Sequence, residues 1–153
     1  MREADSAEVR ELTEFVHLTW PANPHQLASI RTQVRSWLAP LDLTEESEQD
    51  LVLAVNEAAS NSVEHAYLPP TPGDTVELIF WTEAHAVCLE IVDHGAWRVS
   101  SGRSTVRGRG IEMMERLLTS VLIHYDARGT RVLLRHPLPG GSESTLHVSG
   151  RGT

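Results

Sequence analysis

Hydrophobic residues in the first part of the chain follow two different spacings. Residues 12–20 concentrate β-forming side chains before two prolines and predict a first strand. Beyond those prolines, apolar residues three and four positions apart predict an amphipathic helix that Pro40 closes. These apolar residues are Leu27, Ile30, Val34, Trp37 and Leu38.

Residues 44–65 predict the longest helix of the chain. Either Asp42 or Thr44 can cap its first turn, and glutamates in that turn suit the positive end of the helix dipole. Three prolines within residues 69–72 end the segment. The apolar stripe of this helix consists of Leu51, Val52, Val55, Ala58, Ala59 and Val63.

The second half of the chain predicts four strands, formed by residues 75–82, 86–92, 121–125 and 130–136. The first two alternate apolar and polar residues around a short turn, which predicts a hairpin. A polar loop at 93–108 leads into a predicted helix at 110–118. The order β, α, α, β, β, α, β, β predicts an α+β two-layer sandwich: a mostly antiparallel mixed sheet covered on one face by helices.

Composition narrows the class of protein. The chain has 153 residues, 41% of them hydrophobic, which suits one domain with a real core. With 21 acidic against 13 basic residues, it is not expected to bind nucleic acid directly. The single cysteine, Cys88, cannot form an internal disulfide and is predicted to be a core residue. Without a signal-like N-terminus or an apolar run of about 18 residues, we expect a cytoplasmic protein with no membrane association.

The long helix carries the first candidate chemistry. Glu57 and Asn61 are four residues apart and therefore share a helix face. A carboxylate can deprotonate a hydroxyl, and an amide oxygen one turn away can bind Mg²⁺. Taken alone, the same residues also suit the exposed polar face of a surface helix.

A second candidate is the triplet Asp93-His94-Gly95 after an apolar strand. The aspartate can accept a hydrogen bond from an exocyclic amine such as that of adenine, and glycine lets a flat ring approach the backbone. A simple turn is the alternative, because Asp and Gly are common turn residues. Gly129-Thr130, which opens the last strand, indicates by itself only a hairpin turn.

A third candidate is Gly108-Arg109-Gly110, which leads into a predicted helix. Free backbone N–H groups at a helix N-terminus can bind an anion, and Arg103, Arg107 and Arg109 could add phosphate contacts. The absence of GxxxxGK[ST] excludes a P-loop, and the missing third glycine disfavours a dinucleotide-binding turn.

The order of these segments resembles the GHKL ATPase superfamily, the histidine-kinase-like ATPases with the Bergerat fold. Within it, the chain is most similar to the anti-sigma-factor serine/threonine kinases. LVLAVNEAASNSVEHAY resembles the N-box helix of that family, and GRGIEMMERL resembles its second glycine box. The resemblance runs from about Leu12 to His136. It implies one kinase-like domain over residues 1–137 and a flexible Gly/Ser-rich tail over 138–153.

The resemblance also implies roles for individual residues. Glu57 would be the general base and Asn61 the ligand of Mg²⁺. Asp93 would bind the adenine amino group, with a water held by Thr130, while Gly95 would lie under the base. The residues that would cap the phosphates of ATP are Arg107, Gly108, Arg109 and Gly110.

The implied activity is Mg-ATP-dependent phosphorylation of a serine on a STAS-domain anti-sigma-factor antagonist. The kinase would also sequester a sigma factor, in a partner switch that regulates transcription, and would form a homodimer. One departure stands out: the first glycine box of the family has a second glycine where this chain has Trp97, and the lid between Gly95 and Gly108 is short.

Three alternatives follow from the sequence. The departure at Trp97 favours a non-catalytic module of the same fold that binds only a nucleotide or a partner. The catalytic domain of a sensor histidine kinase is disfavoured because the chain shows no dimerisation helix with a phosphoacceptor histidine. The Gly/Ser tail would also suit a linker within a longer signalling protein.

Overall fold

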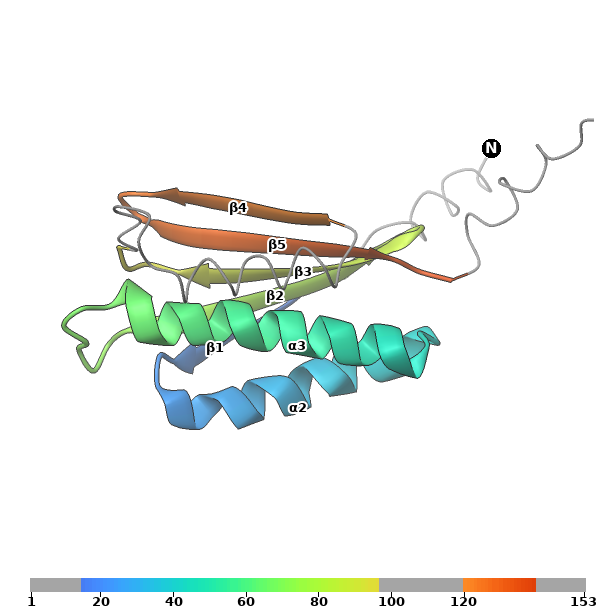
Figure 1. Ribbon diagram of the computed structural model, residues 1–153, viewed down its shortest axis with the longest axis horizontal. Coiled ribbons are helices and arrows are strands. Elements are labelled where there is room, and N and C mark those ends of the chain that lie inside the picture. Colours follow the sequence, from blue (N-terminus) through green and yellow to red (C-terminus); the bar gives the residue numbers. More distant parts are fainter. Residues whose placement is uncertain (1–14, 97–119, 140–153) are drawn as a thin grey trace, which may run out of the picture.

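The computed structural model describes residues 15–96 and 120–139 (Figure 1). The two principal helices are α2 (Leu27–Leu38) and α3 (Glu45–Asn61), and a π-helical turn, η3 (Ser62–Ala66), extends α3. Short 3₁₀ turns η1 (Pro24–Gln26) and η2 (Ala39–Leu41) flank α2. The strands are β1 (Val16–Pro21), β2 (Thr75–Glu83), β3 (Ala86–Asp93), β4 (Ser120–Asp126) and β5 (Gly129–Pro137).

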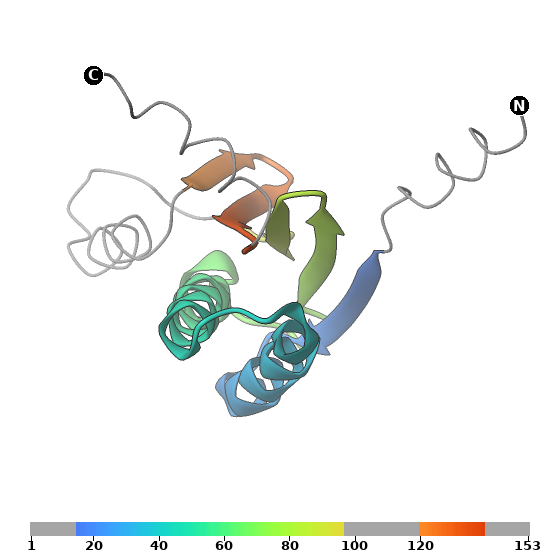
Figure 2. The ribbon, with the colours of Figure 1, turned by 90° about the vertical axis from the view of Figure 1, so that its right-hand side faces the viewer.

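The five described strands form one sheet in the order β1-β2-β3-β5-β4, and each neighbouring pair is antiparallel. Both α2 and α3 lie on the same face of this sheet, as the view along the strands shows (Figure 2). The other face carries neither helix. The predicted two-layer α+β sandwich is therefore confirmed, and in the described residues its sheet is antiparallel throughout.

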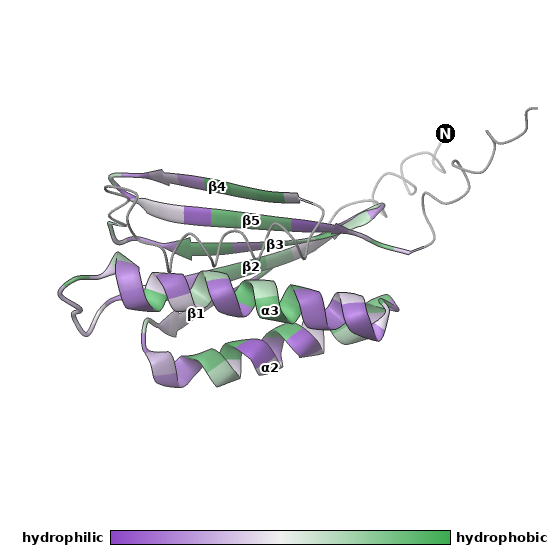
Figure 3. Cartoon of the chain, in the orientation of Figure 1, coloured by the Kyte–Doolittle hydropathy of each residue, from purple (hydrophilic) through white to green (hydrophobic). Residues whose placement is uncertain are grey.

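Local chemistry explains where α3 begins and where α2 ends. The Thr44 hydroxyl accepts a hydrogen bond from the Ser47 N–H at 3.0 Å, whereas Asp42 has a left-handed backbone with φ 58° and ends η2. Of the two predicted caps, the structure therefore uses Thr44. Helix α2 covers the predicted apolar repeat and ends before Pro40. Hydrophilic and hydrophobic residues alternate along both helices, as expected of amphipathic helices (Figure 3).

The core lies between the helices and one face of the sheet. Alternation along β2 buries Val76, Leu78 and Phe80, as the sequence predicts. Strand β3 differs from its neighbour because it is buried on both faces: Cys88 is 1% exposed and Val92 is 3% exposed. The predicted core position of Cys88 is thus confirmed. Its burial has a structural reason, since β3 lies in the middle of the sheet.

Element boundaries differ from the predictions in small ways. Strand β1 begins at Val16, and residues 12–14 of its predicted range lie outside the described residues, as does the whole predicted helix at 110–118. Just after β5, the Leu138 N–H donates to the His85 carbonyl at 2.9 Å. This bond holds the chain beyond β5 against the turn between β2 and β3. No helix within residues 15–96 and 120–139 is long and apolar enough to cross a membrane.

Candidate functional site

Two polar residues face each other at one end of the sheet. Asp93 ends β3 and is paired with Thr130, the second residue of β5. Asp93 is 1% exposed and Thr130 is 2% exposed. Alternation along the strands puts both on the face that α3 covers, next to Ile91 and Val132. Polar groups in such a position need hydrogen-bond partners, because burial without them costs free energy.

The Asp93 carboxylate accepts hydrogen bonds from two different segments. The Ser62 hydroxyl donates to Oδ2 at 2.6 Å, and the Gly95 N–H donates to Oδ1 at 3.2 Å. Ser62 is itself buried and lies 31 positions away along the chain. Both oxygens therefore have a defined donor, which fixes the plane of the carboxylate.

Two neighbouring polar atoms have no such partner. Thr130 Oγ1 and Asn61 Nδ2 are buried, and neither has a hydrogen-bond partner within residues 15–96 and 120–139. An unsatisfied buried group costs about 1–3 kcal/mol, so such groups in folded proteins commonly serve a ligand or an ordered water. The same end of the domain thus combines a buried carboxylate with unused hydrogen-bonding capacity.

The turn after Asp93 lies directly against the end of the long helix. The Ala96 N–H donates to the Ala66 carbonyl at 2.8 Å. A Cβ placed on Gly95 would stand 2.1 Å from that same oxygen, so this approach requires glycine. The close approach that requires glycine here is to the helix end, and the predicted place of Gly95 under the base stays a prediction.

Tyr67 fixes the same turn from its other side. Its hydroxyl donates to the Thr75 carbonyl at 2.6 Å and accepts from the His94 N–H at 2.8 Å. Burial, the largest cause, raises the pKa of the Tyr67 phenol. The hydroxyl therefore keeps its proton at neutral pH and can serve as the donor.

The predicted helical pair lies on α3, as expected. Asn61 is the last residue of α3 and is 4% exposed, while Glu57, one turn earlier, is half-buried. The Asn61 amide fits a Mg²⁺ site, because its oxygen is a hard ligand and its nitrogen is unused by the described chain. No group of three or more His, Cys, Asp and Glu side chains in the described ranges could hold a metal ion by itself. A cation at Asn61 would therefore also need oxygens from a ligand.

The third candidate from the sequence falls in a part of the chain that the structure does not describe. Arg107, Gly108, Arg109 and Gly110 lie outside the described residues, as does Trp97. The residues that sequence reasoning missed are Ser62, Ala66 and Tyr67, which hold the Asp93 turn. Their only sequence signal is their position shortly after Asn61, with Ser62 inside the predicted helix at 44–65 and Ala66 and Tyr67 just beyond it.

The imidazole of His94 lies on the opposite face of the sheet from the Asp93 carboxylate. It contacts Glu77, which also bonds the His17 ring at 2.8 Å. The pKa of Glu77 lies below its ordinary value. Burial, the largest single effect, acts to raise this pKa, but the hydrogen bonds from His94 and His17 together outweigh burial. The side chain of His94 thus attaches the turn to β2.

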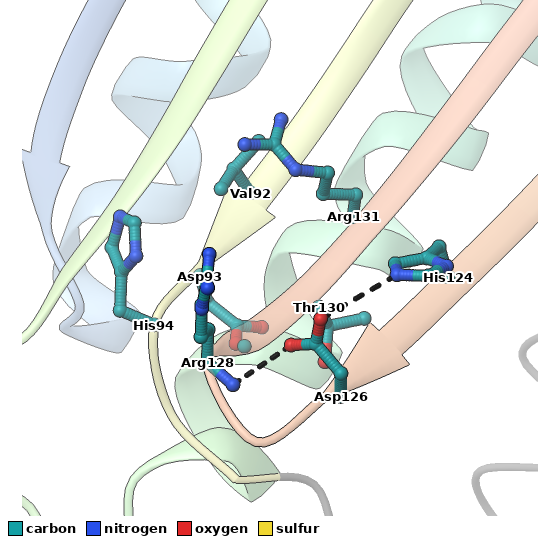
Figure 4. A pocket seen from close by; sticks show the side chains of 9 residues that line it. Val92, Asp93, His94, His124, Asp126, Arg128, Thr130 and Arg131 are labelled. Carbon is teal, nitrogen blue, oxygen red and sulfur yellow. Dashed lines mark hydrogen bonds and ion pairs between the residues drawn. The ribbon is translucent and has the colours of Figure 1, made fainter.

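A pocket of about 290 Å³ opens at this end of the sheet (Figure 4). Strand alternation places its members Val92, His124 and Arg131 on the face without helices, whereas the Asp93 and Thr130 side chains belong to the face that α3 covers. Residues from both faces of the sheet therefore line the pocket, Asp93 and Thr130 among them. It is lined by Val92, Asp93, His94, His124, Asp126, Arg128, Gly129, Thr130 and Arg131.

Comparisons with known proteins agree with this architecture. A family model described as "Histidine kinase-like ATPase domain" matches residues 20–136. The crystal structure of the RsbU and RsbW domains of Rv1364c from Mycobacterium tuberculosis is similar, with 27% sequence identity and a TM-score of 0.64. That match covers 82% of this chain and 32% of the other, so this chain spans about a third of that protein's length.

A second solved structure shares the fold at lower identity. It is the histidine kinase domain from the Erythrobacter litoralis EL346 blue-light activated histidine kinase. The identity is 16% and the TM-score is 0.51, with 73% of this chain and 61% of that chain covered. At this identity the likeness concerns the fold alone.

Proposed function

This chain belongs to the histidine kinase-like ATPase domain family, and on that premise we propose that it binds Mg-ATP and acts as an anti-sigma factor with serine/threonine-protein kinase activity. The observation that carries the proposal is the buried Asp93 carboxylate, oriented by Ser62 beside the Thr130 hydroxyl, which has no hydrogen-bond partner among the described residues. A buried acceptor next to an unused hydroxyl suits the amino edge of adenine. Asn61 is also buried, its Nδ2 has no partner in the part of the chain that the structure describes, and it lies at the end of the adjoining helix.

Each residue of the site would make one contribution. The Asp93 carboxylate accepts the hydrogen bond of the adenine amino group, and the Thr130 hydroxyl holds a water that also reaches the base. Gly95 leaves space for the ring. The Asn61 amide oxygen would hold Mg²⁺, whose charge offsets that of the phosphates when it is bound. The glycine-flanked segment at 107–110 would cap the phosphates.

In this proposal the transfer chemistry belongs to Glu57. Its carboxylate accepts the proton of the attacking serine hydroxyl as that oxygen bonds to the γ-phosphorus and the bond to the β-γ bridging oxygen breaks. Phosphoryl transfer depends chiefly on positioning and electrostatic stabilisation, so a half-buried base one turn from Asn61 suits the reaction.

The proposed partners are a sigma factor and a STAS-domain antagonist that carries the phosphorylated serine. Support comes from the 27% identity to a structure that contains an RsbW domain and from the sequence motifs of the N-box and glycine box. A homodimer in the cytoplasm, with the kinase domain ending near residue 137, completes the proposal.

A phosphotransfer assay tests the proposed activity. The protein would be incubated with γ-labelled ATP, Mg²⁺ and a STAS-domain protein, alongside Glu57→Ala and the control Glu64→Ala, whose side chain is exposed. We expect label on the STAS protein with wild type and with Glu64→Ala, and at least a hundredfold less with Glu57→Ala. Retained transfer by Glu57→Ala would remove it as the base. Nucleotide binding without any transfer by wild type would instead establish a non-catalytic module.

A further inference from the structure

We propose that Ser62 is a specificity-determining positioning residue. Its hydroxyl fixes the orientation of the Asp93 carboxylate, a hydrogen-bond acceptor, and so selects a 6-amino purine over a 6-keto purine. This inference rests on the proposed nucleotide site and adds to it the residue that sets the choice of base.

The Ser62 hydroxyl donates its proton to Asp93. The side chain is 2% exposed and its Oγ lies 2.6 Å from Asp93 Oδ2. A serine hydroxyl has a single proton, and an ionised carboxylate can only accept, so that proton points at Asp93. Because both groups are buried, loss of this hydrogen bond would leave a polar atom unsatisfied.

The π-helical turn explains why a serine at the end of α3 reaches the sheet. Ser62 begins this turn and Ala66 ends it. The Ala66 carbonyl accepts from the Ala96 N–H at 2.8 Å, so both ends of the turn bond the segment around Asp93. Single π-turns inside helices commonly occur at functional sites. Ser62 is thereby fixed relative to the whole Asp93-His94-Gly95 turn.

Two donors on one carboxylate decide which base can pair with it. The Ser62 hydroxyl on Oδ2 and the Gly95 N–H on Oδ1 hold the carboxylate in one orientation. An adenine amino group adds a third donor, whereas the carbonyl oxygen of hypoxanthine would face an acceptor. Sites built to hydrogen-bond a donor reject analogues that lack it, because the buried group is then left unpaired.

Removal of the Ser62 hydroxyl should weaken the preference for ATP over ITP rather than the binding of both nucleotides equally. In Ser62→Ala, Asp93 loses the hydrogen bond to Oδ2, so the plane of its carboxylate is less fixed. We expect ATP affinity to fall roughly tenfold, as for loss of a hydrogen bond to a charged group, with ITP affinity nearly unchanged. The ratio of ATP to ITP affinity should therefore also fall roughly tenfold.

The test is isothermal titration of Mg-ATP and Mg-ITP into wild type, Ser62→Ala, Ser62→Thr and Ser60→Ala. Ser60→Ala is the matched control, because Ser60 lies on the same helix and its hydroxyl donates to the exposed Glu64 at 3.4 Å. Ser62→Thr restores a hydroxyl and should restore most of the wild-type ratio. Circular dichroism checks that each variant is folded, and if Ser62→Ala is not, Ser62→Cys replaces it.

The outcomes separate the two proposals. A reduced ratio in Ser62→Ala, rescued by Ser62→Thr and absent from Ser60→Ala, supports the role of Ser62. An equal loss of both affinities, or an unchanged ratio, would overturn it while leaving the nucleotide site intact. Wild type that binds neither nucleotide would overturn the proposed function itself.

Discussion

Gly95 lies so close to Ala66 that a Cβ on Gly95 would stand 2.1 Å from the Ala66 carbonyl oxygen. The partner atom belongs to backbone, which cannot rotate aside as a side-chain end can. This contact ties the Asp93-His94-Gly95 turn to the end of the long helix, and with it the position of the candidate base-binding carboxylate.

The contact predicts a strong effect of Gly95→Ala. The added methyl must separate the turn from η3 and break the Ala96–Ala66 hydrogen bond, which we expect to cost roughly 2–4 kcal/mol in the free energy of unfolding. Urea denaturation measures it. Gly73→Ala is the matched control, because a Cβ there would meet no atom of the described residues within 4 Å beyond its chain neighbours. A Gly95→Ala variant as stable as the control would show that the contact is not rigid.

Thr130→Val should change the stability of the apo protein and its nucleotide affinity in different ways. The Thr130 hydroxyl is buried without a hydrogen-bond partner in the described residues, so an apolar group of the same shape should leave the apo protein as stable as wild type or up to about 1–2 kcal/mol more stable. Nucleotide affinity should nevertheless fall, because the hydroxyl can no longer hold the water beside the base. Thermal unfolding with and without Mg-ADP checks both. Unchanged affinity would mean that Thr130 has no part in binding.

Cys88 should be chemically inert in the folded protein. Burial, the largest cause, raises the pKa of its thiol to about 11, and the side chain is 1% exposed. At pH 8 we expect labelling by a disulfide reagent to be at least a hundredfold slower than in denaturant, because both the thiolate fraction and access are low. Rapid labelling of the native protein would contradict the placement of β3 at the centre of the sheet.

His136 predicts a direction for the pH dependence of stability. Burial lowers the pKa of His136 below its ordinary 6.5, against the smaller raising effect of Asp50. The unfolded chain therefore binds this proton first as pH falls, so the free energy of unfolding should decrease below about pH 6.5. In His136→Gln this decrease should be smaller, whereas in His85→Gln, at an exposed position, it should match wild type. Equal slopes in all three would assign the acid sensitivity to other groups.

Much of the fold could be predicted because local patterns determine it. The repeat from Leu27 to Leu38 and the alternation along β2 each depend on residues close in sequence, and both match the structure. The order β3-β5-β4 depends instead on contacts between distant segments, which single-strand patterns do not encode.

The residues of the candidate site could likewise be predicted only where they depend on local sequence. Glu57 and Asn61 could be paired from helical spacing alone, and Asp93 from its place after an apolar strand. The bond from Ser62 to Asp93 joins residues 31 positions apart and depends on a π-turn, for which the sequence carries no distinct signal. The residues that orient the carboxylate therefore emerge only from the three-dimensional arrangement.

Nucleotide binding at Asp93 is the central claim, and thermal unfolding with and without Mg-ATP and Mg-ADP tests it most directly. The variant for comparison is Asp93→Asn, which places a donor where the account requires an acceptor. A nucleotide at 100 times its dissociation constant should stabilise wild type by about 2.7 kcal/mol. We predict that shift in wild type, a dependence on Mg²⁺, and its loss in Asp93→Asn. No shift at millimolar nucleotide, or an equal shift in the variant, would contradict the account.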